Sequence, residues 1–263
     1  MLGVFSTTVI VGLYASIMQI YTIYSSLSTA IQGVFFAQVS RTVFENKDDD
    51  EITESIIFPS RLQIIVLFLA LSGFVVFGDS FLEVWIGDSY TDQQLNSAYI
   101  AGIIVMASSM WQLFQNSATS ILKAKKLLRG RVIITSVATI LNFFITFILV
   151  PKYGMIGAAL GTAFSMIFGY GVAMNIYYVR VAKINLKLYY SKTLYKLWYV
   201  LPAVFIVGVL IDNVMANTII LLFIKIVFYI IIYIIGILLC GLNITEKEYF
   251  RTKFLKKIIK RAR

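Results

Sequence analysis

The sequence of 263 residues contains no histidine and a single cysteine, Cys240. A Cys/His zinc cluster, a disulfide within the chain and a nucleophile activated by histidine are therefore excluded. Charged residues are also scarce, at 14%, whereas apolar residues make up 59% of the chain. This composition is typical of a protein whose solvent is lipid. We expect an all-α integral membrane protein that is not an enzyme, with no catalytic residue, no metal and no cofactor.

Seven apolar windows are long enough to cross about 30 Å of hydrocarbon as helices. They fall at about Tyr14–Phe36, Ile57–Val84, Ala98–Leu122, Val132–Val150, Met155–Val179, Leu194–Ile211 and Thr218–Leu242. The fourth and fifth windows are separated only by Pro151-Lys152-Tyr153-Gly154, which has the composition of a turn. We therefore predict about seven transmembrane helices, of which the fourth and fifth form a hairpin.

The cations are distributed on one side of these windows. All 23 Lys and Arg residues except Lys152 and Lys225 lie in alternate loops or in the C-terminal tail. The positive-inside rule assigns that side to the cytoplasm and predicts a cytoplasmic C-terminus. The net charge of +10 is then explained by anionic lipid head groups, and we expect no nucleic-acid partner.

The two ends of the chain carry separate expectations. Residues 1–13 have neither a basic flank nor a cleavage site of small residues, so we expect them to be the outer end of a truncated preceding helix. Residues 14–179 are expected to form a bundle of five helices, and residues 180–243 two further helices. Residues 244–263 alternate apolar and basic residues at helical spacing, which predicts a basic amphipathic helix that anchors in the interface or binds a partner.

Polar side chains within the windows are the candidates for a transport path, because they are costly in hydrocarbon. The third window carries Gln112, Gln115 and Asn116, and the first carries a weaker stripe that includes Gln19 and Ser26. These residues line a hydrated cavity or form hydrogen bonds between helices, and the sequence leaves both interpretations open.

Charged groups in the windows are few. None of the 13 Asp and Glu residues is central in a window, and the run 48–51 is interpreted as a solvated loop. Lys225 lies about 11 Å into the last window at 1.5 Å per residue. Tyr229 and Tyr233 follow on the same helical face and could hold its ammonium group or help it bind an anionic head group. Snorkelling of Lys225 toward water is the alternative.

Small residues mark the predicted contact within the hairpin. Gly154, Gly157 and Gly161 are spaced so that a neighbouring helix can approach closely. Asn142, near the middle of the fourth window, is expected to form a hydrogen bond across this contact, since an unpaired amide in lipid costs several kcal/mol. We assign these residues, with Pro151, to helix packing.

Several strings resemble a known family. ILKAKK from Ile121, VPKYGMIGAALGT from Val150 and FAQVSR from Phe36 are similar to the C-terminal half of bacterial polysaccharide flippases. These O-antigen transporters belong to the multidrug/oligosaccharidyl-lipid/polysaccharide exporter superfamily. In the last string, Ala37 stands where the family commonly has proline.

The resemblance implies the C-terminal lobe of a two-lobe flippase plus two extra C-terminal helices. It further implies transport of an undecaprenyl-diphosphate-linked oligosaccharide across the bacterial cytoplasmic membrane, with Arg41, Arg61 and Lys225 as diphosphate or head-group candidates. The implied partners are the lipid-linked oligosaccharide, membrane lipids, and polysaccharide polymerase and chain-length machinery.

Two other functions stay open at this point. A multidrug or cation exporter of the same superfamily would be favoured by an acidic residue deep in the membrane, and no window carries one near its centre. A membrane-embedded polysaccharide polymerase or acyltransferase would need larger outer loops with convergent polar residues.

Overall fold

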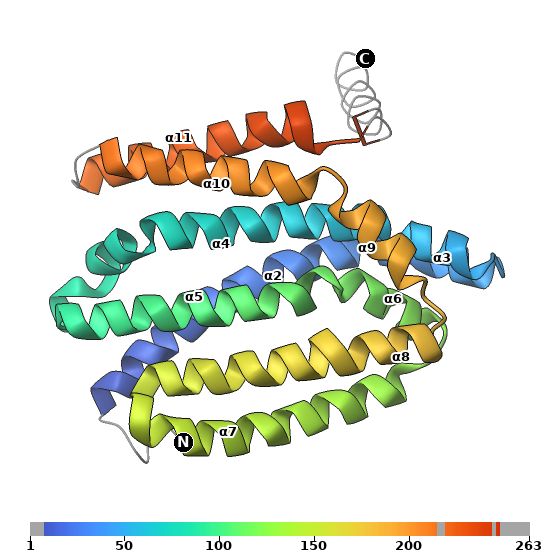
Figure 1. Cartoon of the computed structure of the whole chain (residues 1–263), viewed down its shortest axis with the longest axis horizontal. Helices are drawn as coiled ribbons and strands as arrows, with labels where there is room; N and C mark the ends of the chain where they lie inside the picture. Colours follow the sequence, from blue (N-terminus) through green and yellow to red (C-terminus); the bar gives the residue numbers. More distant parts are fainter. Residues whose placement is uncertain (1–7, 215–218, 244–245, 248–263) are drawn as a thin grey trace, which may run out of the picture.

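A computed structural model describes residues 8–214, 219–243 and 246–247 (Figure 1). The described residues form helices and contain no strand. The main elements are α2 (Thr8–Phe44), α3 (Asp49–Ser55), α4 (Ile57–Ile86), η1 (Gly87–Ser89), α5 (Asp92–Phe114), α6 (Asn116–Ala124), α7 (Leu128–Met166), η2 (Ile167–Ala173), α8 (Met174–Arg180), α9 (Leu186–Leu194), α10 (Leu197–Val214), α11 (Ile219–Gly236) and η3 (Ile237–Gly241). The predicted tail, residues 244–263, lies outside the described residues except for Glu246 and Lys247.

The described residues include six helical stretches that are long and apolar enough to cross a membrane. One of them, Leu128–Arg180, has 53 residues and folds back on itself at Gly154, where φ is 54° and ψ is −128°. This backbone conformation is open to glycine and strained for other residues. The stretch therefore supplies two antiparallel crossings, which confirms the all-α membrane fold of about seven helices.

The crossings lie side by side in a curved layer. Figure 1 shows the two arms of the hairpin at one edge, followed by α5, α4 and the α10–α11 pair. The first arm is α7 up to Gly154, and the second is the rest of α7 with η2 and α8. α2 crosses behind this layer and contacts α4, α5 and α6. The first half of α2 contacts the layer through apolar residues, and Leu13 and Ile17 are fully buried there. One face of α2 therefore lies against the bundle and the other is turned outward.

The first helix begins earlier than expected. Residues 8–13 continue directly into the first predicted span, because Val9, Ile10 and Val11 are apolar and no proline interrupts the chain. The expectation that residues 1–13 form the end of a separate helix is therefore wrong for residues 8–13. Residues 1–7 lie outside the described part of the chain.

Two predicted loops contain short helices. The acidic run 48–51 begins α3, because the Asp48 side chain accepts a hydrogen bond from the Glu51 backbone N–H at 2.6 Å and so caps the helix. The loop between the fifth and sixth crossings contains α9. The Asn185 side chain caps its first turn by accepting a hydrogen bond from the Leu188 backbone N–H at 3.1 Å. Both helices lie at the end of the bundle where most cations gather.

Candidate functional site

The outward face of α2 carries a stripe of small and polar residues. These residues follow each other at steps of three and four and are all exposed: Gln19, Thr22, Ser26, Thr29 and Gly33. The three hydroxyl groups donate to carbonyl groups of α2 itself at 2.7–3.2 Å, so their hydrogen bonds need no partner from the rest of the bundle. No atom lies within 4 Å of the position that a Cβ would take at Gly33. Gln19 and Ser26 thus share an accessible surface.

Other outward faces of the bundle are different. α7 exposes Phe143, Phe147 and Ile148, and α11 exposes Ile220 and Phe223, each to at least half of its surface. Large apolar side chains of this kind are suited to contact with lipid chains. The stripe on α2 is therefore the polar exception among the long outward faces.

Gln115 and Asn116 lie where the third crossing breaks between α5 and α6. Gln115 is only 3% exposed. Its amide donates to the Tyr190 hydroxyl at 2.6 Å and to the Asn175 side-chain oxygen at 3.3 Å. Asn116 donates to the Ser28 hydroxyl at 2.9 Å. In this conformation Gln115 forms hydrogen bonds between helices and does not line an open cavity.

The break itself is stabilised by side chains from distant parts of the sequence. The Leu113 carbonyl accepts from Ser28 at 2.6 Å, and the Asn116 carbonyl accepts from Gln32 at 2.7 Å. A helix interruption frees backbone carbonyl groups, which are costly in hydrocarbon unless they find donors. α2 therefore supplies the donors that the break requires.

A buried amide in α4 completes this network. Gln63, which is 0% exposed, donates to the Ser28 hydroxyl at 3.1 Å and accepts from the Ser117 hydroxyl at 2.9 Å. The sequence reasoning missed Gln63 and Ser28, although a glutamine inside an apolar window was a visible signal. Gln112, by contrast, is half-buried, and its side-chain oxygen accepts no hydrogen bond from the described residues.

Arg61 is buried at the junction of three segments. It is 1% exposed, and its guanidinium pairs with the buried Glu246 carboxylate at 2.5 Å. Its other N–H groups donate at 2.7–3.0 Å to four backbone carbonyls at the ends of α9 and η3, those of Lys192, Thr193, Tyr195 and Gly241. Cations are favoured at helix C-termini because the carbonyl ends carry partial negative charge. Arg61 therefore joins α4 to the ends of two other helices.

The other two head-group candidates lie apart from Arg61. Arg41 is 81% exposed and pairs with Glu45 at 2.7 Å, which lowers the pKa of the Glu45 carboxyl. Lys225 is 1% exposed and pairs with the Asp212 carboxylate at 2.9 Å, near the opposite end of α4. The structure does not bring the three cations together.

The tyrosines that follow Lys225 have other partners. The Tyr229 hydroxyl donates to Ser72 at 2.7 Å, and the Tyr233 hydroxyl donates to the Ile65 carbonyl at 2.7 Å. They attach α11 to α4, and the ammonium group finds Asp212 instead. The sequence could not indicate this pairing, because it joins two predicted helices across a turn of unknown geometry.

The residues assigned to helix packing lie in the hairpin. Asn142 donates to the Thr162 hydroxyl at 3.5 Å and accepts from Thr146 at 2.8 Å. A Cβ at Gly161 would lie 2.2 Å from the Thr146 hydroxyl oxygen, and one at Gly157 would lie 2.5 Å from the Leu149 carbonyl oxygen. Only glycine permits this approach of the two arms.

Two apolar cavities lie along α4 and share Leu69. One of about 350 Å³ lies between α2, α4, α5 and α11, and Tyr24 lines it. The other, of about 290 Å³, lies between α4 and the last helix and ends at Arg61 and Glu246. A third cavity of about 720 Å³ at this end is lined by polar and aromatic residues, including Gln38, Glu54 and Lys192. Glu54 and Lys192 form an ion pair there.

No family model matches the chain. The chain is 27% identical over 232 residues to the probable low-salt glycan biosynthesis flippase Agl15 of Haloferax volcanii. The aligned region is 86% of this chain and 46% of Agl15. The chain is therefore similar to a glycan flippase over most of its own length. Among solved structures, its fold is similar to that of the lipid II flippase MurJ in an inward closed conformation, with a TM-score of 0.68 and 15% identity over 86% of this chain and 46% of MurJ.

The similarity to these two flippases tests the expectations drawn from the sequence. The expected relationship is confirmed, and so is a multi-pass membrane fold, which here is MurJ-like. Both are transporters by name, in agreement with the expectation that the chain is not an enzyme. The chain spans about half of their length, at 46% of each.

Proposed function

We propose that this chain forms one lobe of a flippase that moves a lipid-linked glycan across a membrane. The similarity to the glycan flippase Agl15, which extends over 86% of the chain, carries the proposal. A MurJ-like arrangement of helices supports it. Transporters of this kind work by alternating access between two bundles around a central site, and a chain that spans 46% of its relatives fits one of those bundles.

The stripe on α2 is the surface on which the glycan path would lie. It is polar and accessible, with the exposed Ile23 side chain between Gln19 and Ser26, whereas the faces of α7 and α11 are apolar. We therefore assign Gln19 and Ser26 to the path, together with Gln112, whose side-chain oxygen has no donor among the described residues. Gln115 and Asn116 would act behind this surface, where they fix the break between α5 and α6.

The two apolar cavities along α4 would hold the polyprenyl chain of the carrier lipid. Together they follow α4 from Phe58 to Phe81, a rise of about 35 Å at 1.5 Å per residue. This length matches the hydrocarbon thickness of a bilayer, about 30 Å. We propose undecaprenyl diphosphate as the carrier, and the cytoplasmic membrane of a bacterium, with a cytoplasmic C-terminus, as the location. Polysaccharide polymerase and chain-length proteins are the proposed partners.

The proposal is tested by transport of a lipid-linked oligosaccharide in a host that lacks its own polysaccharide flippase. Residues 1–263 would be expressed alone and together with the N-terminal lobe of a relative. We expect surface polysaccharide only from the pair. Restoration by the 263 residues alone would contradict the proposal of one lobe, and failure of every combination despite normal membrane insertion would contradict transport.

A further inference from the structure

Three lysines have the left-handed backbone conformation that is usually found at glycine. Among the described residues outside glycine, four have positive φ, namely Asn46 and three lysines. Lys126, with φ of 58°, follows the end of α6. There the Leu127 N–H donates to the Leu122 carbonyl at 2.8 Å, the hydrogen bond that defines a Schellman motif. A left-handed residue in this motif is usually glycine, because a Cβ is strained there.

A second strained lysine ends α8. Lys183 has φ of 57°, and the neighbouring Ile184 N–H donates to the Tyr178 carbonyl at 3.0 Å. The side chains of Lys126 and Lys183 are both exposed, and neither has an ion pair or a side-chain hydrogen bond within the part of the chain that the structure describes. No ion pair or side-chain hydrogen bond with the described residues therefore offsets the backbone strain at these two lysines.

The two strained turns lie next to each other. The Lys125 ammonium donates to the Ala182 carbonyl at 2.9 Å, which links the turn after α6 to the turn after α8. The Tyr177 hydroxyl donates to the Leu127 carbonyl at 2.9 Å. A Cβ at Gly130 would lie 2.1 Å from the Tyr177 ring, so these segments are in tight contact. Both turns lie at the same end of the bundle in Figure 1.

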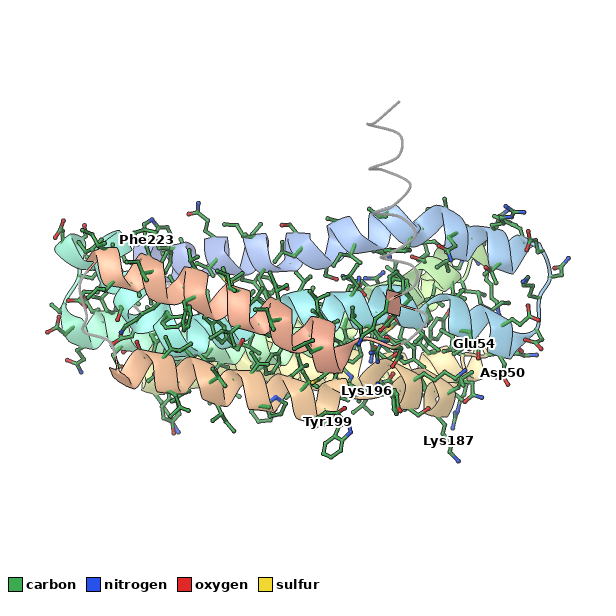
Figure 2. The ribbon with its side chains drawn as sticks, turned by 90° about the horizontal axis from the view of Figure 1, so that it is seen from above. Asp50, Glu54, Lys187, Lys196, Tyr199 and Phe223 are labelled. Carbon is green, nitrogen blue, oxygen red and sulfur yellow. The ribbon has the colours of Figure 1, made fainter. Side chains whose placement is uncertain are left out.

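The joined turns carry positive charge, most of which forms no ion pair among the described residues. Lys125 pairs with Asp49, but the other cations of this surface have no carboxylate partner among the described residues. We call this surface the basic platform, and it consists of Lys126, Arg129, Arg131, Arg180, Lys183 and Lys187. Figure 2 shows Lys187 projecting away from the bundle at the end that also carries Asp50 and Glu54. Such a surface is complementary to anions.

The anion is identified by the apolar surface that continues from the basic platform. Leu128, Val132 and Ile133 alternate with its arginines along α7 and are 39%, 60% and 64% exposed. On α8, Val179 is 48% exposed beside Arg180. Cations that border an exposed apolar surface match the position of phosphate groups above lipid chains. An acidic soluble protein would leave this apolar border uncovered.

We propose that the basic platform is a binding site for anionic phospholipid head groups. The two lysines supply positive charge at backbone positions where glycine would have less conformational strain. Lipid phosphates bridge the turns after α6 and α8 and so fasten the hairpin of α7 and α8 to the rest of the bundle. The inference is independent of the transported substrate.

The test uses the full chain in neutral detergent and compares wild type with K126G, K183G and the double variant. Two quantities are measured: the unfolding temperature with and without added phosphatidylglycerol, and the preference for spin-labelled phosphatidylglycerol over phosphatidylcholine. Without lipid, we expect the glycine variants to unfold at the same temperature as wild type or above it, because the strain is relieved. The lipid preference should fall about fivefold for each cation removed.

Controls separate the alternatives. K152Q removes a cation next to the bend at Gly154, at the opposite end of the hairpin, and should leave the preference for phosphatidylglycerol unchanged. K126R should retain it. Lower unfolding temperatures of the glycine variants with an unchanged lipid preference would assign the lysines to the fold and overturn the proposal. Loss of the preference on addition of inorganic diphosphate, but not of sodium chloride at the same ionic strength, would identify a soluble anion as the ligand and would also overturn it.

Discussion

Replacing Arg61 by glutamine should destabilise the bundle more than any exposed charge substitution. The guanidinium is 1% exposed and bonds to Glu246 and to four backbone carbonyls of two helix ends. The shorter amide cannot reach all of these acceptors and cannot neutralise the buried carboxylate. The cavity of about 290 Å³ that ends at Arg61 is otherwise apolar and offers the Glu246 carboxylate no substitute donor, whereas the cavity of about 720 Å³, which Arg61 and Glu246 also line, has polar walls.

Breaking a buried ion pair by removal of one partner costs about 3–5 kcal/mol. For a chain of this size we expect the unfolding temperature of R61Q to fall by about 6–20 °C. Thermal unfolding of the purified chain in detergent, followed by the fluorescence of its three tryptophans, measures the change. The double variant R61Q/E246Q should lose less than the sum of the two single variants, because it leaves no buried charge unpaired.

R41Q is the matched control. Arg41 is also paired with a glutamate, but it is 81% exposed, and exposed pairs contribute about 0–1 kcal/mol. Equal unfolding temperatures for R61Q and R41Q would refute the assignment of Arg61 as the junction of α4, α9 and η3. Strict additivity in the double variant would refute the importance of the ion pair itself.

Three further predictions follow from the bundle. In the assembled transporter, S26C should react with a membrane-impermeant thiol reagent in at least one transport state, whereas S28C should stay protected, because Ser28 is 0% exposed. G161A should destabilise the hairpin by about 1–3 kcal/mol through overpacking, measured by thermal unfolding, whereas G33A should be neutral or stabilising, since its Cβ meets no atom within 4 Å. A reporter fused after Asp88 should be found outside the cytoplasm, and a cytoplasmic signal there would refute the topology.

The crossings could be predicted because they depend on local sequence. A membrane span needs only length and apolar composition, and the hairpin needs only a turn too short for any other connection, so Pro151 to Gly154 sufficed. The contact between Asn142 and the second arm was predictable for the same reason. Its partner, Thr162, lies 20 residues away.

The candidate site was less predictable, because its contacts are distant in sequence. The break at Gln115 depends on donors from Ser28 and Gln32, 84 or more residues away, and no local signal marks it. A stripe of polar residues on one helix looks the same whether it faces water or another helix. The structure separates Ser26, which is exposed, from Gln115, which is buried.

Arg61 also bears on how the protein assembles during synthesis. Its partners Gly241 and Glu246 lie 180 and 185 residues later in the chain, so Arg61 enters the membrane long before they are made. Until then its side chain can reach water or lipid phosphates only by extending toward the interface. Arrival of the last helix removes this charge from the interface and buries it. Closure of this end of the bundle therefore waits for residues 241–246, and a chain that ends before residue 241 would leave Arg61 without these partners.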